Sequence, residues 1–238
     1  MTSSIADTSA GLQAAGTVLV TGASRGLGRA LAEFYAADGW RVIACIRKVS
    51  SEKAAGMLYH PLDVSDAASI EALGKRLEGK AIDVVINNAA VRGDIGGLAS
   101  LKADDFMEVM RVNALAPLLI ARTLRPNLLA GQRKLVVNIS SRAGSLAEGT
   151  LDDDDGDYAY RCSKAALNMA TVKLAQDFQH DGITVVSMHP GWIRSEMGGP
   201  DAVVDVAESA QGLKTLIDTT TMAATGSFRA YDGKTVSW

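Results

Sequence analysis

The sequence has only two cysteines, Cys45 and Cys162, and neither lies in a CxxC pair. This number is too small for a disulfide framework, and we expect reduced thiols in a cytoplasmic protein. The three histidines are scattered along the chain, so we predict no metal site. No segment approaches the roughly 18 uninterrupted apolar residues that a membrane-spanning helix needs, and we expect no membrane partner.

The chain also lacks a large excess of positive or negative charge. The formal net charge is −3, and there is no lysine-rich or arginine-rich run that could follow a phosphate backbone. Nucleic acid is therefore not an expected partner. Aromatic residues make up only 5% of the chain, but hydrophobic residues make up 47%, which is typical of a globular protein with a sizeable core. The length suits one large α/β domain, which we assign to residues 16–238 after a flexible N-terminal tail at 1–15.

Short apolar segments alternate along the chain with segments of helical spacing. We predict strands at 17–22, 40–46, 56–64, 81–90, 134–140, 183–191 and 226–231. We predict helices at 29–39, at 66–79, at 102–130 with a kink at Pro117, from Tyr158 onward, and at 203–219. This alternation indicates a doubly wound parallel sheet of about seven strands with helices on both faces.

A glycine-rich stretch, "TGASRGLG", follows the first predicted strand. Gly22, Gly26 and Gly28 are spaced so that the backbone can turn tightly and a pyrophosphate can approach the N-terminus of the next helix. Ligands bind beyond the carboxyl ends of the strands in such sheets. The stretch therefore predicts a dinucleotide site, although a tight connection without a ligand is the alternative.

The second predicted strand ends in "ACIRK", without an acid to receive the adenosine ribose of NAD. Arg47 and Lys48 follow at once, and Arg25 in the glycine-rich stretch adds a guanidinium group that suits a phosphate. We therefore favour NADP(H) as cofactor, with NAD(H) possible. The alternative is that Arg47 and Lys48 are solvated loop charges.

The stretch "LDDDDGDYAYRCSKAAL" at 151–167 contains two tyrosines before a single lysine. Tyr160 and Lys164 are four residues apart and share a helix face, whereas Tyr158 is six residues from Lys164. An ammonium group beside a phenol lowers the phenol pKa from its usual value of about 10. Tyr160 is therefore the candidate general acid.

Together these motifs resemble the short-chain dehydrogenase/reductase family. "TGASRGLG", "LDV", "NNAA", "VNA", "NISS", "YRCSK" and "HPG" occur in the family's order over nearly the whole chain. The stretches "YAYRCSKAALN" and "HPGWIRSEMGGPDA" look most like the branch of the C-signal factor and the carbonyl reductase Sniffer. The resemblance implies a Rossmann-type domain and an NAD(P)(H)-dependent carbonyl reductase or alcohol dehydrogenase. The alternative is a nucleotide-binding signalling or regulatory protein of the C-signal type.

The resemblance also implies residue roles. Tyr160 would protonate the carbonyl oxygen, and Lys164 would lower the pKa of Tyr160 and hold the nicotinamide ribose. Ser141, in preference to Ser140, would donate a hydrogen bond to the substrate oxygen, and Asn113 would anchor a water linked to Lys164. The implied cofactor contacts are Gly22, Ser24, Arg25, Gly26, Leu27, Gly28 and Arg47, Asp63 and Val64 at adenine, Asn87 and Ala89 beside nicotinamide, Tyr160 and Lys164, and Pro190, Gly191, Ile193 and Ser195.

Three departures from the family pattern stand out. Ala90 replaces a usual glycine, Ser195 replaces a common threonine, and Tyr160 lies 19 positions after Ser141, a longer gap than usual. The extra length contains aspartates 152, 153, 154, 155 and 157, which do not match an EF-hand calcium loop because Leu151 and Cys162 would occupy its ends. We predict a solvated, mobile loop near the substrate entrance, which disfavours anionic substrates or only aids solubility.

The implied partners are a small carbonyl or alcohol substrate and further copies of the chain. The predicted helices after the fourth and fifth strands are apolar over more than one face. In the family such helices commonly pack against their symmetry mates, so we expect a homodimer or homotetramer. The alternative is that both helices are buried only against their own sheet.

Overall fold

The computed structural model describes residues 14–49, 56–149 and 156–238. Within them, seven parallel strands form one sheet in the order β3-β2-β1-β4-β5-β6-β7, so the order reverses between β1 and β4. The strands are β1 (Thr17–Thr21), β2 (Arg41–Ile46), β3 (Met57–Pro61), β4 (Val84–Asn87), β5 (Leu135–Ile139), β6 (Thr184–His189) and β7 (Phe228–Ala230). The predicted tail at 1–15 falls almost wholly outside the described residues, which begin at position 14.

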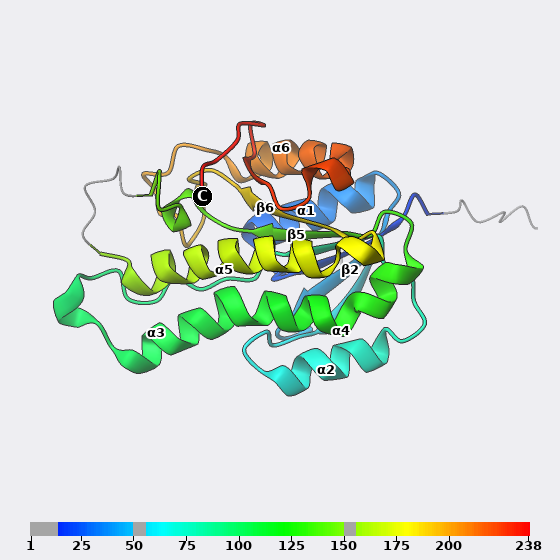
Figure 1. Cartoon of the computed structure of the whole chain (residues 1–238), viewed down its shortest axis with the longest axis horizontal. Coiled ribbons are helices and arrows are strands. Elements are labelled where there is room, and N and C mark those ends of the chain that lie inside the picture. The colour runs from blue at the N-terminus through cyan, green and yellow to red at the C-terminus, as the bar shows by residue number, and fades with distance from the viewer. Residues whose placement is uncertain (1–13, 50–55, 150–155) are drawn as a thin grey trace, which may run out of the picture.

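Helices cover both faces of the sheet (Figure 1). α1 (Gly26–Ala37) and α6 (Val206–Thr219) pack together on one face, and α2 (Ala67–Arg76), α4 (Ala116–Ala130) and α5 (Tyr158–Asp177) cover the other. Because successive side chains of a strand point to opposite faces, Val18 and Val20 enter the core under α1 and α6, while Leu19 enters the core on the other face. The predicted Rossmann-type α/β fold is confirmed.

The long helix predicted at 102–130 has a change of winding near its middle. α3 (Ala103–Met110) continues into a π-helical turn, η2 (Arg111–Leu115), and then into α4. Proline has no N–H, so Pro117 cannot donate to the carbonyl of Asn113 four residues earlier. The Ala116 N–H instead bonds to the carbonyl of Arg111, five residues earlier. The predicted irregularity at Pro117 is thus a π segment that contains Asn113.

Short 3₁₀ turns complete the described structure. They are η1 (Leu98–Ser100), η3 (Arg142–Gly144), η4 (Gln179–Asp181) and η5 (Met222–Ala224). Among the described residues, no helix combines the length and apolar character that crossing a membrane requires.

Candidate active site

The carboxyl ends of β1 and β4 are tied together at the point where the strand order reverses. The Thr21 hydroxyl accepts hydrogen bonds from the N–H groups of Asn88 and Ala89, at 2.9 and 3.0 Å. The Asn88 side chain donates to the Thr21 carbonyl at 2.9 Å. These bonds place the glycine-rich turn beside Asn87 and Ala89, two of the residues expected on the nicotinamide side.

The turn itself leaves open space at Gly26, where a ligand's phosphates could approach, but no room for a side chain at Gly28. Gly22 has a φ of +67° and Gly26 a φ of +54°, conformations that favour glycine. A Cβ at Gly28 would lie 2.4 Å from Nδ2 of Asn88 and 2.5 Å from the Gly22 carbonyl oxygen, whereas a Cβ at Gly26 would meet no atom within 4 Å. The backbone at Gly26 is thus open, and the N-cap Arg25 makes no side-chain hydrogen bond to α1. A helix N-terminus approachable in this way fits a dinucleotide pyrophosphate.

The two arginines expected at the adenosine phosphate lie in different surroundings. Arg47 is exposed at the end of β2. Arg25 forms an ion pair with Glu196, which comes from the loop after β6. Both partners of this pair are largely exposed, so it contributes little stability and can exchange for a phosphate. The sequence offered no sign of this contact.

The other expected cofactor residues lie along the same edge of the sheet. Leu62, which leads into Asp63 and Val64, donates its N–H to the carbonyl of Ile46 at the end of β2, at 2.9 Å. The Asp63 carboxylate accepts from the N–H and the hydroxyl of Ser65, at 3.0 and 2.8 Å, and so closes its own turn.

The loop after β6 is shaped by its backbone. Gly191 has a φ of +82°, and a Cβ there would lie 2.9 Å from the ring of Tyr231. The Pro190 carbonyl accepts a 2.6 Å bond from Ser209 of α6, and Ile193 pairs with Val204 in an isolated bridge. The Ser195 hydroxyl accepts from the N–H of Gly198 at 3.2 Å. The loop is therefore held on both sides, and its Glu196 reaches the glycine-rich turn through the ion pair with Arg25.

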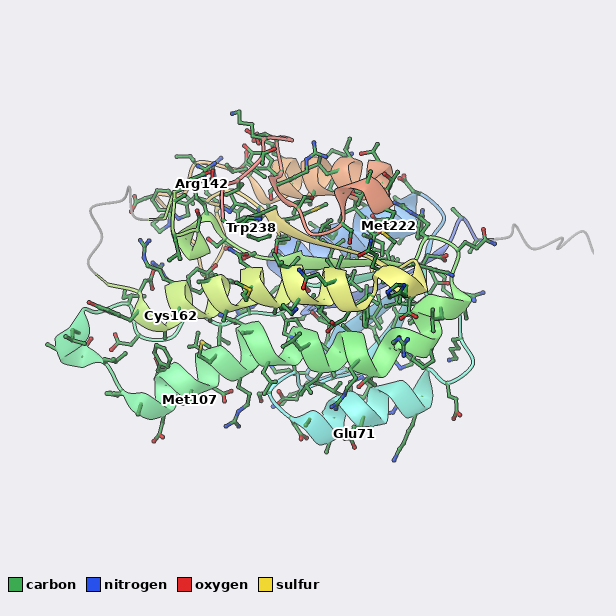
Figure 2. The ribbon with its side chains drawn as sticks, in the orientation of Figure 1. Glu71, Met107, Arg142, Cys162, Met222 and Trp238 are labelled. Atoms are coloured by element: carbon green, nitrogen blue, oxygen red, sulfur yellow. The ribbon has the colours of Figure 1, made fainter. Side chains whose placement is uncertain are left out.

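Tyr160 and Lys164 project from the first turns of α5 toward the end of β5. Lys164 is buried, its Nζ donates to the Ile139 carbonyl at 2.9 Å, and it lies 5.6 Å from the centre of the Tyr160 ring. Ser141 begins the η3 turn just beyond β5 and hydrogen-bonds to Tyr160. Figure 2 shows Arg142, which follows Ser141, at the same end of the molecule as Cys162 in α5. Tyr158 is more exposed, at 39%.

The electrostatics of this pair differ from the expectation. Burial raises the pKa of Tyr160, and this is the largest effect. The hydrogen bond with Ser141 and the positive charge of Arg92 lower the pKa, and the negative charge of Asp157 raises it. Burial also lowers the pKa of Lys164 to about 8. The predicted lowering of the Tyr160 pKa by Lys164 is therefore wrong for this structure, because the ammonium group is directed at the Ile139 carbonyl and loss of water is the larger effect.

Asn113 uses its side chain to hold the neighbouring loop. Its Oδ1 accepts from the N–H of Val91 at 2.9 Å, and its Nδ2 donates to the Val91 carbonyl at 2.7 Å and to the Ser163 hydroxyl at 3.0 Å. Ser163 in turn donates to the Tyr160 carbonyl at 2.7 Å. Both N–H groups of the side-chain amide are thus used within the protein. A water linked to Lys164 would therefore have to bind a different atom of Asn113.

A buried polar network lies beneath Ser141, and it separates the two candidate serines. Ser140 is 1% exposed and donates to Oδ1 of Asn168 at 2.6 Å, whereas Ser141 is partly exposed and lies next to the Tyr160 hydroxyl. Asn168 also donates to the Gly144 carbonyl at 3.2 Å. The network continues through Ser187, Thr171, Asn138 and Asn87. Asn168 was not predicted, although it continues the four-residue spacing of Tyr160 and Lys164.

His189, at the end of β6, lies against the same turn. Its Nδ1 accepts a 3.3 Å hydrogen bond from the N–H of Arg142. Burial lowers the pKa of His189 to about 4, so the ring is neutral at pH 7 and can act as this acceptor.

The prediction of a wholly solvated acidic loop is wrong for Asp157. This carboxylate is 7% exposed and contacts the guanidinium of Arg92 from the loop after β4, at 2.5 Å. A nearby arginine compensates the charge, which makes burial of the aspartate possible. Aspartates 152–155 lie outside the described residues.

A family model for short chain dehydrogenases matches residues 16–230. The chain belongs to the short-chain dehydrogenase family and is an oxidoreductase that uses a nicotinamide cofactor. Among curated relatives, C-signal of Myxococcus xanthus is 40% identical over 157 residues, covering 66% of this chain and 93% of that protein. The 1-hydroxy-2-glutathionyl-2-methyl-3-butene dehydrogenase of Rhodococcus is 33% identical over 230 residues, covering 93% and 99%.

Solved carbonyl reductases match nearly the whole chain. The NADPH-bound carbonyl reductase from chicken fatty liver superimposes with a TM-score of 0.87 at 31% identity, over 95% of this chain and all of that one. The carbonyl reductase Sniffer of Drosophila melanogaster gives a TM-score of 0.87 at 26% identity, over 94% and 99%. These neighbours do not favour the alternative of a nucleotide-binding signalling or regulatory protein of the C-signal type.

Proposed function

We propose that the chain is an NADP(H)-dependent carbonyl reductase that acts on small aldehydes or ketones and can run in reverse on alcohols. The observation that carries the proposal is the convergence of Tyr160, Lys164 and Ser141 at the end of β5, next to an open glycine-rich turn. A protein that only bound a nucleotide would not need a phenol, an ammonium and a hydroxyl gathered at the end of one strand.

Proton transfer in this proposal belongs to Tyr160. Its raised pKa keeps the phenol protonated at neutral pH, so it can donate a proton to a carbonyl oxygen that becomes negatively charged. The Ser141 hydroxyl accepts from the N–H of Ala143 at 3.2 Å, which leaves its own proton for the phenol or the substrate oxygen. Lys164, whose Nζ lies 5.6 Å from the centre of the Tyr160 ring, would supply a donor for the nicotinamide ribose.

The glycine-rich turn would hold the pyrophosphate, with Asp63 and Val64 at adenine and the loop at 190–195 over the nicotinamide. The nicotinamide supplies the hydride when it is bound. Arg47, exposed beside the end of β2, and Arg25 would bind the 2′-phosphate. Support for NADP comes from the NADPH-bound chicken enzyme and from a Burkholderia multivorans short-chain dehydrogenase/reductase with bound NADP, which is 30% identical with a TM-score of 0.81.

A panel of aldehydes, ketones and alcohols, assayed by cofactor absorbance, tests this proposal. We expect at least one carbonyl compound to be reduced with a higher kcat/KM for NADPH than for NADH. A higher value with NADH would contradict the assignment of Arg47. Absence of turnover with every compound and both cofactors would contradict the reductase itself.

We also propose that residues 16–238 form one domain that assembles as a homodimer or homotetramer. Large apolar side chains are exposed along the helices after β4 and β5, among them Leu115, Leu129 and Met169. Light scattering at micromolar concentration should give a multiple of the 24.9 kDa chain mass, and the mass of a single chain would contradict this. The two cysteines are free, which fits a cytoplasmic location.

A further inference from the structure

Arg92 and Asp157 form a close, partly buried ion pair at the edge of the candidate active site. Nε of Arg92 lies 3.0 Å from each carboxylate oxygen of Asp157, and Nη2 lies 2.5 Å from Oδ2. The side chain of Asp157 is 7% exposed and that of Arg92 36%. This two-pronged geometry fixes the relative orientation of both groups.

The pair connects three segments that surround Tyr160. Asp157 has a φ of +59°, and its carbonyl accepts from the N–H of Arg161 at 2.9 Å, so it sets the start of α5 three residues before Tyr160. Its own N–H donates to the Ile95 carbonyl at 3.4 Å. Arg92 additionally donates from Nη1 to the Met197 carbonyl, at 3.4 Å, in the loop after β6. One guanidinium thus contacts both the residue that precedes α5 and the loop after β6.

We propose that Arg92 and Asp157 are positioning residues for Tyr160: they hold the first turn of α5 and balance each other's charge beside the phenol. This rests on the proposed function of Tyr160 as the acid. A pair that only joined loops would stabilise the fold without affecting the phenol's ionisation.

The charged and polar groups around the Tyr160 side chain come from four places. Ser141 comes from the turn after β5, Lys164 from α5, Asp157 from the start of α5, and Arg92 from the loop after β4. The negative charge of Asp157 raises the pKa of Tyr160, and the positive charge of Arg92 lowers it. With both present the two effects oppose each other, so removing either charge should expose the effect of the other.

Ionisation of Tyr160 can be measured with or without turnover. Tyrosinate absorbance is titrated for the unaltered chain, Asp157→Asn and Arg92→Gln, each with the matching Tyr160→Phe chain subtracted. We expect the Tyr160 pKa to move down in Asp157→Asn and up in Arg92→Gln. Arg92→Lys keeps the positive charge, so the pKa of Tyr160 in this variant should stay close to that of the unaltered chain. If Arg92→Gln does not fold, Arg92→Lys and Asp157→Asn still test the proposal.

Activity gives the second readout. Carbonyl reduction needs a protonated Tyr160, so kcat/KM falls as pH rises through its pKa. This fall of kcat/KM at alkaline pH, the alkaline limb of the pH profile, should move to lower pH in Asp157→Asn and to higher pH in Arg92→Gln. The matched control is the Arg125–Asp181 pair, which has the same two-pronged contact at 2.5 and 2.8 Å but joins α4 to η4. Arg125→Gln and Asp181→Asn should leave the limb in place.

If the pKa of Tyr160 does not change in Asp157→Asn and Arg92→Gln, or changes in the same direction in both, the proposed role of the pair is overturned. Failure of the proposed function looks different: the unaltered chain would reduce no carbonyl compound, or Tyr160→Phe would keep its activity. The tyrosinate titration decides the role of the pair in either case, because it needs no substrate.

Discussion

Replacement of Asn168 by alanine tests the buried network beneath Ser141. Asn168 is 4% exposed, and its loss leaves the Ser140 hydroxyl and the Gly144 carbonyl without the partner that the amide provides. Ser187 also donates to Oδ1 of Asn168, at 3.4 Å, but it keeps its 2.9 Å bond with Thr171. An unsatisfied buried polar group costs about 1–3 kcal/mol, so two such groups give a loss of about 2–4 kcal/mol once the longer 3.2 Å bond to Gly144 is weighted less. For a domain of this size each kcal/mol lowers Tm by roughly 2–4 °C, which gives a decrease on the order of 4–16 °C.

Asp177 provides a matched control, because it lies on the same helix but is exposed. Asp177→Ala should change the free energy of unfolding by no more than about 0.5 kcal/mol. Both variants are compared by thermal and urea unfolding monitored by circular dichroism. Ser141 lies between the two anchored residues, so Asn168→Ala should also lower kcat/KM by about tenfold to a hundredfold. An Asn168→Ala chain that melts and turns over like the Asp177→Ala chain would refute the reasoning.

Three further predictions concern the cofactor edge and the η3 turn. Gly28→Ala places a Cβ 2.5 Å from the Gly22 carbonyl oxygen, and we expect the free energy of unfolding to fall by about 1–3 kcal/mol. We also expect weaker NADPH binding, measured by nucleotide fluorescence. Unchanged binding would contradict the argument that a side chain at position 28 disturbs the glycine-rich turn. Arg47→Asp should lower the ratio of kcat/KM for NADPH over NADH by about tenfold to a hundredfold, and an unchanged ratio would show that Arg47 does not contact the 2′-phosphate. Burial lowers the pKa of His189 from its usual 6.5 to about 4 in the folded chain, so between these two pH values the unfolded chain binds more protons than the folded chain. The free energy of unfolding should therefore decrease as the pH falls through this range. His189→Asn should make this decrease smaller when unfolding by urea is measured at several pH values.

Local patterns were sufficient to predict the sheet. Each buried strand is a short apolar run, and each crossover helix has its own spacing, so all seven strands were located and most ends fell within a few residues. The glycine-rich turn and the four-residue spacing of Tyr160 and Lys164 are also local signals. The π segment at 111–115 was anticipated only as a kink, because a proline predicts a disturbed helix but not which hydrogen bonds replace the lost one.

Contacts between distant loops were not predictable. Arg92 and Asp157 are 65 positions apart, and Arg25 and Glu196 are 171 apart, so nothing in the spacing of either pair indicates that they meet. For the same reason Asp157 was grouped with its acidic neighbours although its partner lies after β4. The pKa of Tyr160 depends on burial, which only the folded arrangement determines.

The central claim is that Tyr160 is the proton donor of a nicotinamide-dependent carbonyl reductase, and the most direct test compares Tyr160→Phe with Tyr158→Phe. Phenylalanine keeps the ring in each case and removes only the hydroxyl. We expect Tyr160→Phe to lose carbonyl reduction while NADPH affinity and the circular dichroism spectrum stay close to those of the unaltered chain, and Tyr158→Phe to retain most of its activity. Near-normal kcat/KM in Tyr160→Phe would contradict the account.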